Sequence, residues 1–165
     1  MRARIATDHE HERYNAFASS SAYADILQSW EWGEVKRRSG WTPRRFLAED
    51  DGGRIVGSAQ VLGRRPVRGA PRLLYAPRGP VVEEFRGDAL GALIGEVRAR
   101  AGDAFVLKCD PPVEEGSSEA QAMLDAGFVI EQLREPAVPA HAITEPHGAR
   151  WQRLPLFLHV RAAKR

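Results

Sequence analysis

Apolar residues recur at helical spacing in four stretches of the chain. The clearest stripe runs between Asp88 and Ala101, and Gly102 closes it. Thr7 and Glu10 have the spacing of a capping box at the start of the first stretch, and Ser29 is a good N-cap for the second. These patterns predict helices over residues 8–18, 30–38, 88–101 and 118–126.

Runs of apolar and β-branched residues between these helices predict strands. The tetrapeptide at residues 50–53, Asp-Asp-Gly-Gly, is a strong hairpin turn, and Pro111 and Pro112 must end the last clear strand. The predicted strands cover residues 42–49, 54–65, 72–76 and 104–109, and residues 128–130 lead into a further strand. This order of elements predicts an α/β or α+β layered domain, with a central, mostly antiparallel sheet flanked by helices.

The pattern fails after Ile130. Residues 134–165 contain four prolines, three of the five histidines and no sustained periodicity. The charge also changes, because residues 1–133 carry 18 Lys/Arg against 20 Asp/Glu, whereas residues 134–165 carry 6 against 2. We therefore expect a folded domain over residues 1–133 and an irregular basic tail over residues 134–165.

Composition is that of a soluble globular protein, with 43% apolar and 28% charged residues in 165. No apolar run approaches the roughly 20 residues that span a bilayer, so no integral membrane segment is expected. The first residues have no apolar signal-peptide core, and a cytoplasmic location is therefore expected. The body is not a generally basic domain that would bind nucleic acid through its overall field.

The most informative segment runs from Leu27 to Trp41 and contains three tryptophans. Trp32 and Lys36 are four residues apart and share one face of the predicted helix. A lysine beside an aromatic surface suits an anionic ligand with a ring system, such as a nucleotide diphosphate. The alternative is that the tryptophans belong to the core and the Lys-Arg-Arg run is a solvated face, and residue types alone leave both possibilities open.

Four motifs in order resemble the Fem family of peptidoglycan bridge-forming aminoacyltransferases, over about residues 7–130. The first is the family's opening signature, which stands here as Gln28, Ser29, Trp32, Gly33 and Lys36. The other three are Gly57-Ser-Ala-Gln-Val-Leu, Tyr75-Ala-Pro-Arg-Gly-Pro-Val and Leu107-Lys-Cys-Asp-Pro, the last followed by Ala126-Gly-Phe. Each motif is weak by itself, and their order and spacing together are specific.

The resemblance implies a GNAT-like acyltransferase fold and the transfer of an amino acid from aminoacyl-tRNA to the peptide stem of a UDP-linked or lipid-linked muropeptide precursor. It implies that Lys36 holds the diphosphate of the precursor and that Asp110 lies near the acceptor as the catalytic candidate. Trp32 and Gln28 are supporting substrate-binding candidates, and Arg78 is a further one. An aspartate before two prolines also commonly initiates a turn, which is the alternative for Asp110.

Two other classes of function are considered. An acyl-CoA transferase needs a glycine-rich turn at a helix N-terminus, but residues 60–66 run into Pro66 and no helix, so CoA use and any other cofactor are not expected. A non-catalytic module that binds the precursor is the second alternative. No metal site is expected, because His9 and His11 diverge in a helical turn, and Cys109 is interpreted as an inert core thiol.

The resemblance also implies a second GNAT-like domain, since members of the family are more than twice as long. The similarity stops near residues 131–132. Our hypothesis is that a frameshift or premature stop left residues 134–165 as out-of-frame translation. One domain would lack the opposite wall of the substrate cleft, so low activity is expected of this chain alone.

Overall fold

The fold is built around one sheet, seen in a computed structural model that describes residues 1–85, 87–114 and 116–128. Within these residues the sheet has six strands in the order β1-β2-β3-β4-β6, with β5 paired to β3. Neighbouring strands are antiparallel except β4 and β6, which are parallel. The strands are β1 (Arg2–Ile5), β2 (Thr42–Glu49), β3 (Ile55–Arg64), β4 (Arg72–Ala76), β5 (Val81–Val82) and β6 (Ala104–Cys109).

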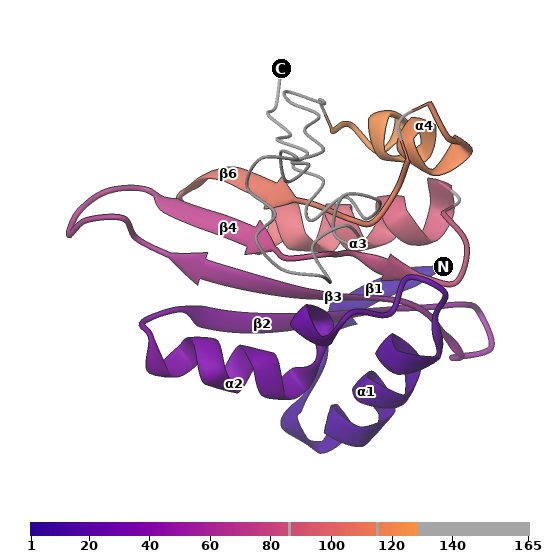
Figure 1. Cartoon of the computed structure of the whole chain (residues 1–165), viewed down its shortest axis with the longest axis horizontal. Helices are drawn as coiled ribbons and strands as arrows, with labels where there is room; N and C mark the ends of the chain where they lie inside the picture. The colour runs from indigo at the N-terminus through magenta and orange to yellow at the C-terminus, as the bar shows by residue number, and fades with distance from the viewer. Residues whose placement is uncertain (86, 115, 129–165) are drawn as a thin grey trace, which may run out of the picture.

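Helices lie on both faces of the sheet (Figure 1). One pair lies below β2 and β3 in this view, and the other lies above the sheet. No helix of the described residues is long and apolar enough to cross a membrane. The helices are α1 (His11–Ser20) and α2 (Trp30–Arg38) below, and α3 (Gly87–Ala99) and α4 (Ser118–Asp125) above, with short 3₁₀ turns η1 (Asp8–Glu10) and η2 (Ile26–Gln28).

Alternation along β2 divides the core into two layers. Phe46 and Ala48 pack in the larger cluster with α3 and α4, whereas Leu47 packs with Tyr14 and Trp30 on the side of α1 and α2. This is the expected consequence of a period of two in a strand that is covered on both faces. The sheet therefore has an α3 face, covered by α3 and α4, and an α2 face, on the side of α1 and α2.

Side-chain and backbone bonds in the turn fix the β2–β3 hairpin. The carboxylate of Asp50 accepts hydrogen bonds from the backbone N–H groups of Gly52 and Arg54, both at 3.0 Å. Gly53 has φ of 78°, a conformation that favours glycine. The turn places Arg45 opposite Gln60 in the β2–β3 register.

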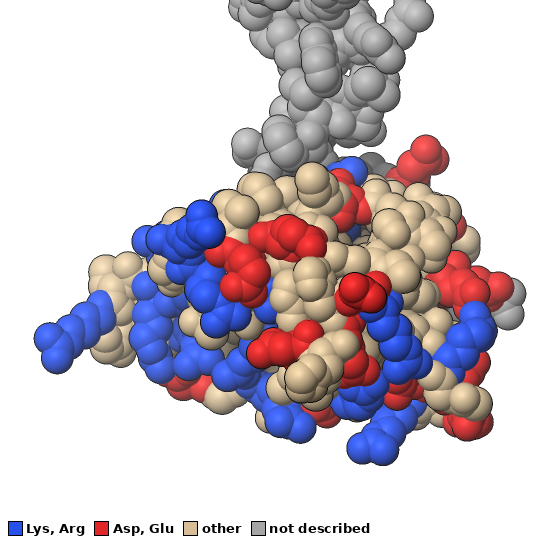
Figure 2. All heavy atoms as spheres, turned by 90° about the horizontal axis from the view of Figure 1, so that it is seen from below, with Lys and Arg blue, Asp and Glu red and all other residues tan. Residues whose placement is uncertain are grey.

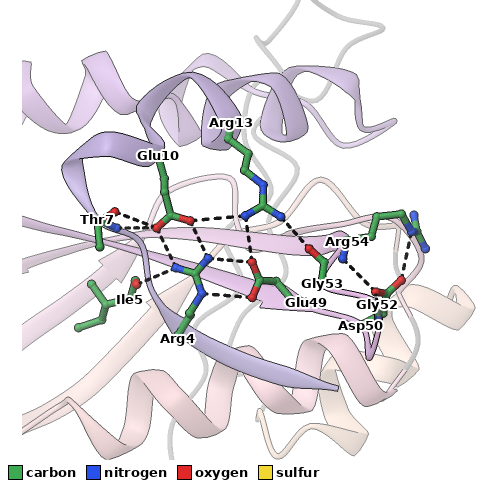
Figure 3. Close-up of polar contacts among 10 residues, drawn as sticks. All are labelled: Arg4, Ile5, Thr7, Glu10, Arg13, Glu49, Asp50, Gly52, Gly53 and Arg54. Carbon is green, nitrogen blue, oxygen red and sulfur yellow. Dashed lines mark hydrogen bonds and ion pairs between the residues drawn. The ribbon is translucent and has the colours of Figure 1, made fainter.

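An ion-pair network ties β1 to α1 and β2 (Figure 3). The guanidinium of Arg4 donates to Glu10 at 2.6 Å and to Glu49 at 2.7 Å, and Arg13 donates to Glu49 at 3.2 Å. The Arg4 guanidinium lowers the pKa of Glu10 to about 2, with help from the Thr7 backbone. The capping box therefore has a second use, since Glu10 both accepts from the Thr7 N–H and holds the first strand.

The predicted elements are confirmed, with bounds that shift by a few residues. The first predicted helix begins as the 3₁₀ turn η1 and continues to Ser20, beyond the predicted end at residue 18. Two strands were not predicted: β1 is short and half arginine, and β5 has only two residues. The predicted continuation at residues 129–130 and the tail at 134–165 lie outside the described residues.

Candidate functional site

The candidate lysine lies on α2, whose start is fixed by a side-chain cap. The Ser29 hydroxyl accepts a hydrogen bond from the Trp32 N–H at 3.2 Å, as the N-cap prediction requires. One turn later, the Lys36 ammonium lies 4.8 Å from the centre of the Trp32 ring, within range of a cation–π contact. The helix therefore presents an ammonium and an indole together, as the i, i+4 spacing predicted.

Strand register places a second group of polar residues on the same face of the sheet as α2. Residues opposite one another on paired strands share a face, as do residues two apart on one strand. Gln60 lies under α2, so Leu62, two residues on, and its partner Tyr75 in β4 also face that side. Tyr75 is in register with Lys108 of β6, whose ammonium is 5.4 Å from the Tyr75 ring centre.

This face of β4 and β6 has no described α-helix over it, because α1 and α2 lie below β2 and β3 (Figure 1). Tyr75 and Lys108 are accordingly partly exposed. The described residues thus form an open sheet face beside α2, which we call the open face. It brings Lys36 and Tyr75 to the same side of the molecule.

Asp110 follows β6 and lies behind the open face. Its carboxylate accepts hydrogen bonds from the Tyr75 hydroxyl at 2.9 Å and from the Arg78 N–H at 2.7 Å. The residue is only 3% exposed, and this burial raises the pKa of its carboxyl group despite those two bonds. Direct contact between Asp110 and a ligand is therefore restricted, and its hydrogen-bond partner Tyr75 is partly exposed.

Tyr75 is a candidate that sequence patterns do not identify. It opens the Tyr-Ala-Pro-Arg motif, and that motif by itself assigns it no role. Burial, together with the charge of Asp110, raises the pKa of its phenol, so the hydroxyl stays protonated and donates to the carboxylate.

Arg78 has an unusual backbone conformation. Its φ is 55°, a left-handed region that costs free energy for any residue with a Cβ atom. The conformation points its N–H at Asp110, and its side chain donates to Asp25 at 3.2 Å. Arg78 thus shapes the carboxylate site through its backbone, with a partly exposed side chain already engaged by an acid.

Gln28 lies inside the protein and has no exposed surface. Its amide donates to the Pro77 carbonyl at 2.6 Å and accepts from the Gln60 N–H at 2.8 Å. A Cβ atom at Gly79 would collide with this amide. For Gln28 we therefore propose a positioning role in place of the expected contact with substrate.

Positive charge gathers at the end of the molecule where α2 ends and β2 begins. Figure 2 shows Lys and Arg concentrated at the left, the same side as this end in Figure 1. The contributors on the α2 side include Lys36, Arg37 and Arg38 in the last turn of α2. The field there favours an anionic ligand although the body as a whole carries slightly more acids than bases.

Neither of two cavities in the described residues contains Lys36 or Asp110. One, of about 280 Å³, lies between β6 and α3 and includes Phe105 and Phe128. The other, of about 690 Å³, lies between α1 and η2 and includes Asn15 and Ile26. The candidate site is thus the open face itself.

Cys109 and His11 lie outside the open face. Cys109 is buried with 1% exposure, and burial raises the pKa of its thiol, which agrees with an inert core residue. The His11 ring lies 2.6 Å from the Glu31 carboxylate in an exposed pair.

Solved structures of other proteins define the class of fold. A GCN5-related N-acetyltransferase from Kribbella flavida superposes with a TM-score of 0.59 at 22% identity, covering 99% of this chain and 97% of that one. At this identity the likeness shows the fold alone, and it confirms the GNAT-like prediction. FemX superposes more closely, with a TM-score of 0.71 at 32% identity over 82% of this chain and 34% of that one.

The chain belongs to the FemAB family, which matches residues 9–146. It is 35% identical over 133 residues to lipid II:glycine glycyltransferase of Staphylococcus aureus. It is 32% identical over 137 residues to UDP-N-acetylmuramoylpentapeptide-lysine N(6)-alanyltransferase of Weissella viridescens. These alignments cover 78% and 82% of this chain but only 31% and 40% of the relatives.

The family resemblance is thereby confirmed, and the chain spans about a third of the curated relatives that it matches. The family match extends to residue 146, past the expected boundary at residue 133. That boundary lies outside the described residues and stays a prediction.

Proposed function

We propose that this chain supplies the first domain of a peptidoglycan bridge-forming aminoacyltransferase. In this proposal the domain binds a muropeptide precursor, and an amino acid passes from aminoacyl-tRNA to an amine of the precursor's peptide stem. The two named relatives are a lipid II:glycine glycyltransferase and a UDP-N-acetylmuramoylpentapeptide-lysine N(6)-alanyltransferase. The substrates place the proposed reaction in the cytoplasm, as part of cell-wall biogenesis.

The observation that carries the proposal is the placement of Lys36. Its ammonium lies beside the Trp32 ring, on the helix that flanks the open face with Tyr75 and Asp110. A lysine acts as a point charge on phosphate, and the concentration of cations around the end of α2 strengthens its attraction for a diphosphate. The indole offers an apolar surface next to that charge.

In the proposed reaction, the acceptor amine attacks the ester carbonyl of the aminoacyl-tRNA. A new N–C bond forms, the C–O bond to the ribose breaks, and a proton leaves the amine while the ribose oxygen gains one. In this proposal Tyr75, whose hydroxyl donates to Asp110, accepts a hydrogen bond from the amine and so orients it. The Arg78 N–H holds the carboxylate in place for this purpose.

Transfer requires both substrates to be held together, which is where most of the rate advantage of such reactions arises. We propose that a second GNAT-like domain forms the opposite wall over the open face. The relatives, of which this chain covers 31% and 40%, are long enough to contain one. A domain alone would then bind the precursor and transfer little, which is the behaviour of a precursor-binding module.

The acyl-CoA alternative is weakened by the course of β3. The strand continues to Arg64 and is followed by an exposed connection to β4, so its end offers no helix N-terminus to a pyrophosphate.

The test is a calorimetric titration of the chain with UDP-N-acetylmuramoyl-pentapeptide and, separately, with acetyl-CoA. We expect saturable binding of the muropeptide and none of acetyl-CoA. The reverse result would overturn the proposal in favour of the CoA enzyme. Adding aminoacyl-tRNA to the muropeptide complex and following the transferred label separates an active transferase from a binding module.

A further inference from the structure

A buried polar network lies between α2 and the sheet, with Gln60 at its centre. Gln60 is in the middle of β3 and has no exposed surface. Its amide nitrogen donates to the carbonyl oxygens of Leu27 at 3.0 Å and Ser29 at 2.8 Å. It therefore holds the backbone that leads into α2, including the residue that caps the helix.

Arg45 extends the network along α2. It is 4% exposed, and its guanidinium donates to the Gln60 amide oxygen at 3.2 Å, the Trp30 carbonyl at 2.7 Å and the Glu34 carboxylate at 2.8 Å. The guanidinium also lies 4.1 Å from the centre of the Trp30 ring. Arginine suits this place because its rigid fork serves several acceptors at once and stacks on aromatic faces.

On its other side the network reaches the loop after β4. The Gln60 N–H donates to Gln28, and Gln28 donates to the Pro77 carbonyl. Pro77 directly precedes Arg78, whose N–H donates to Asp110. Hydrogen bonds of the Gln60 side chain on one side and of its backbone N–H on the other, with one further peptide link, thus join the helix that carries Lys36 to the carboxylate behind Tyr75.

The cost of disturbing such a network is high. Gln28, Gln60 and Arg45 are buried, and a buried donor or acceptor left unpaired costs about 1–3 kcal/mol. Movement of α2 relative to the loop would break several of these bonds together. The helix and the loop are therefore held in one relative placement, which is what a two-part substrate site requires.

We propose that Gln60 and Arg45 are positioning residues, which fix Lys36 and the Tyr75–Asp110 pair relative to one another through this network. The consequence for precursor binding rests on the proposed function. The physical coupling of α2 to the loop does not depend on the proposed function, and it can be measured without any ligand.

The ligand-free test is amide hydrogen exchange on the whole chain with Gln60→Leu. We expect exchange to accelerate at least tenfold at both the Trp32 N–H, which donates to the Ser29 cap, and the Arg78 N–H, which donates to Asp110. The control is Leu93→Ala, a fully buried change on the α3 face. The two variants are compared under conditions in which both have lost the same free energy of unfolding. If Leu93→Ala then accelerates exchange at these two amides as much as Gln60→Leu does, the proposal is overturned.

The second arm is a double-mutant cycle for binding of UDP-N-acetylmuramoyl-pentapeptide. Lys36→Ala should weaken binding about 10- to 100-fold in the wild-type background and less than threefold with Gln60→Leu, because a displaced lysine contributes little to binding. Equal factors in both backgrounds would contradict positioning. A merely structural role lowers stability without changing this ratio.

A variant that does not fold and a wild-type chain that does not bind the muropeptide are separate outcomes. If Gln60→Leu does not fold, Arg45→Lys replaces it, because lysine keeps the charge and cannot serve the three acceptors. If the wild-type chain does not bind the muropeptide, the proposed function fails for this chain, and the exchange experiment still decides whether α2 and the loop are coupled.

Discussion

Replacing Gly33 with alanine should destabilise the protein although it improves helix propensity. Gly33 lies in the middle of α2, and a Cβ atom there would collide with the Gln60 amide oxygen and the Arg45 guanidinium. The glycine thus provides the space in which these two side chains meet the helix. Its place in the family signature has a physical reason.

The magnitude follows from two opposing terms. Alanine in place of glycine in a helix interior gains about 1 kcal/mol. Displacing Arg45 leaves a buried guanidinium without its acceptors, which costs about 3 kcal/mol, the low end for a broken buried pair, because its partner Glu34 is 45% exposed. The net expectation is a loss of about 2 kcal/mol in the free energy of unfolding.

Urea denaturation of Gly33→Ala and of a matched control measures this difference. Gly95→Ala in α3 is the control, because an added Cβ there meets nothing within 4 Å. It should stabilise the protein by up to about 1 kcal/mol. A Gly33→Ala protein as stable as wild type would show that the buried network yields at little cost, and the reasoning about α2 would be refuted.

Three further results are expected. Because Arg4 lowers the pKa of Glu10 to about 2, the stability from this pair is present above about pH 4.5 and is lost as the pH falls toward 2. Acid denaturation of Glu10→Gln should lack this component, and an acid profile equal to that of the wild type would contradict it. Cys109 should react with a thiol reagent only on the timescale of unfolding, as rates in increasing urea would show, whereas immediate modification would contradict its burial. Arg78→Gly should be about 1–2 kcal/mol more stable than Arg78→Ala, since both lose the side chain and only glycine relieves the positive φ; equal stabilities would mean that the backbone is not strained.

Sequence patterns predicted most of the fold because its elements are regular. The caps at Thr7 and Ser29, the hairpin turn at residues 50–53 and the single-face stripe of α3 are local signals, and each is confirmed. β1 was missed because half of its residues are arginines. One of them, Arg4, is placed by acids 6 and 45 positions away in the sequence, which no local pattern shows.

The candidate site was predictable in its motifs and not in its contacts. The i, i+4 spacing of Trp32 and Lys36 was sufficient to pair them. The burial of Gln28 and Asp110 could not be predicted, because a polar residue in a motif can equally bind a ligand or form hydrogen bonds with the backbone. Arg45 carried no signal at all, since a buried arginine in a strand is identified only when Glu34 and Gln60 are folded around it.

The most direct test compares two substitutions in the same turn of α2, Lys36→Ala and Arg37→Ala. The quantity measured is the affinity of each variant for UDP-N-acetylmuramoyl-pentapeptide. Arg37 is already paired with Glu34 and is the matched loss of one charge. A hydrogen bond to a charged group contributes about 1.5–3 kcal/mol, so Lys36→Ala should raise the dissociation constant about 10- to 100-fold, and Arg37→Ala less than threefold. Equal, small effects of the two substitutions would mean that the ammonium beside the indole does not hold the diphosphate.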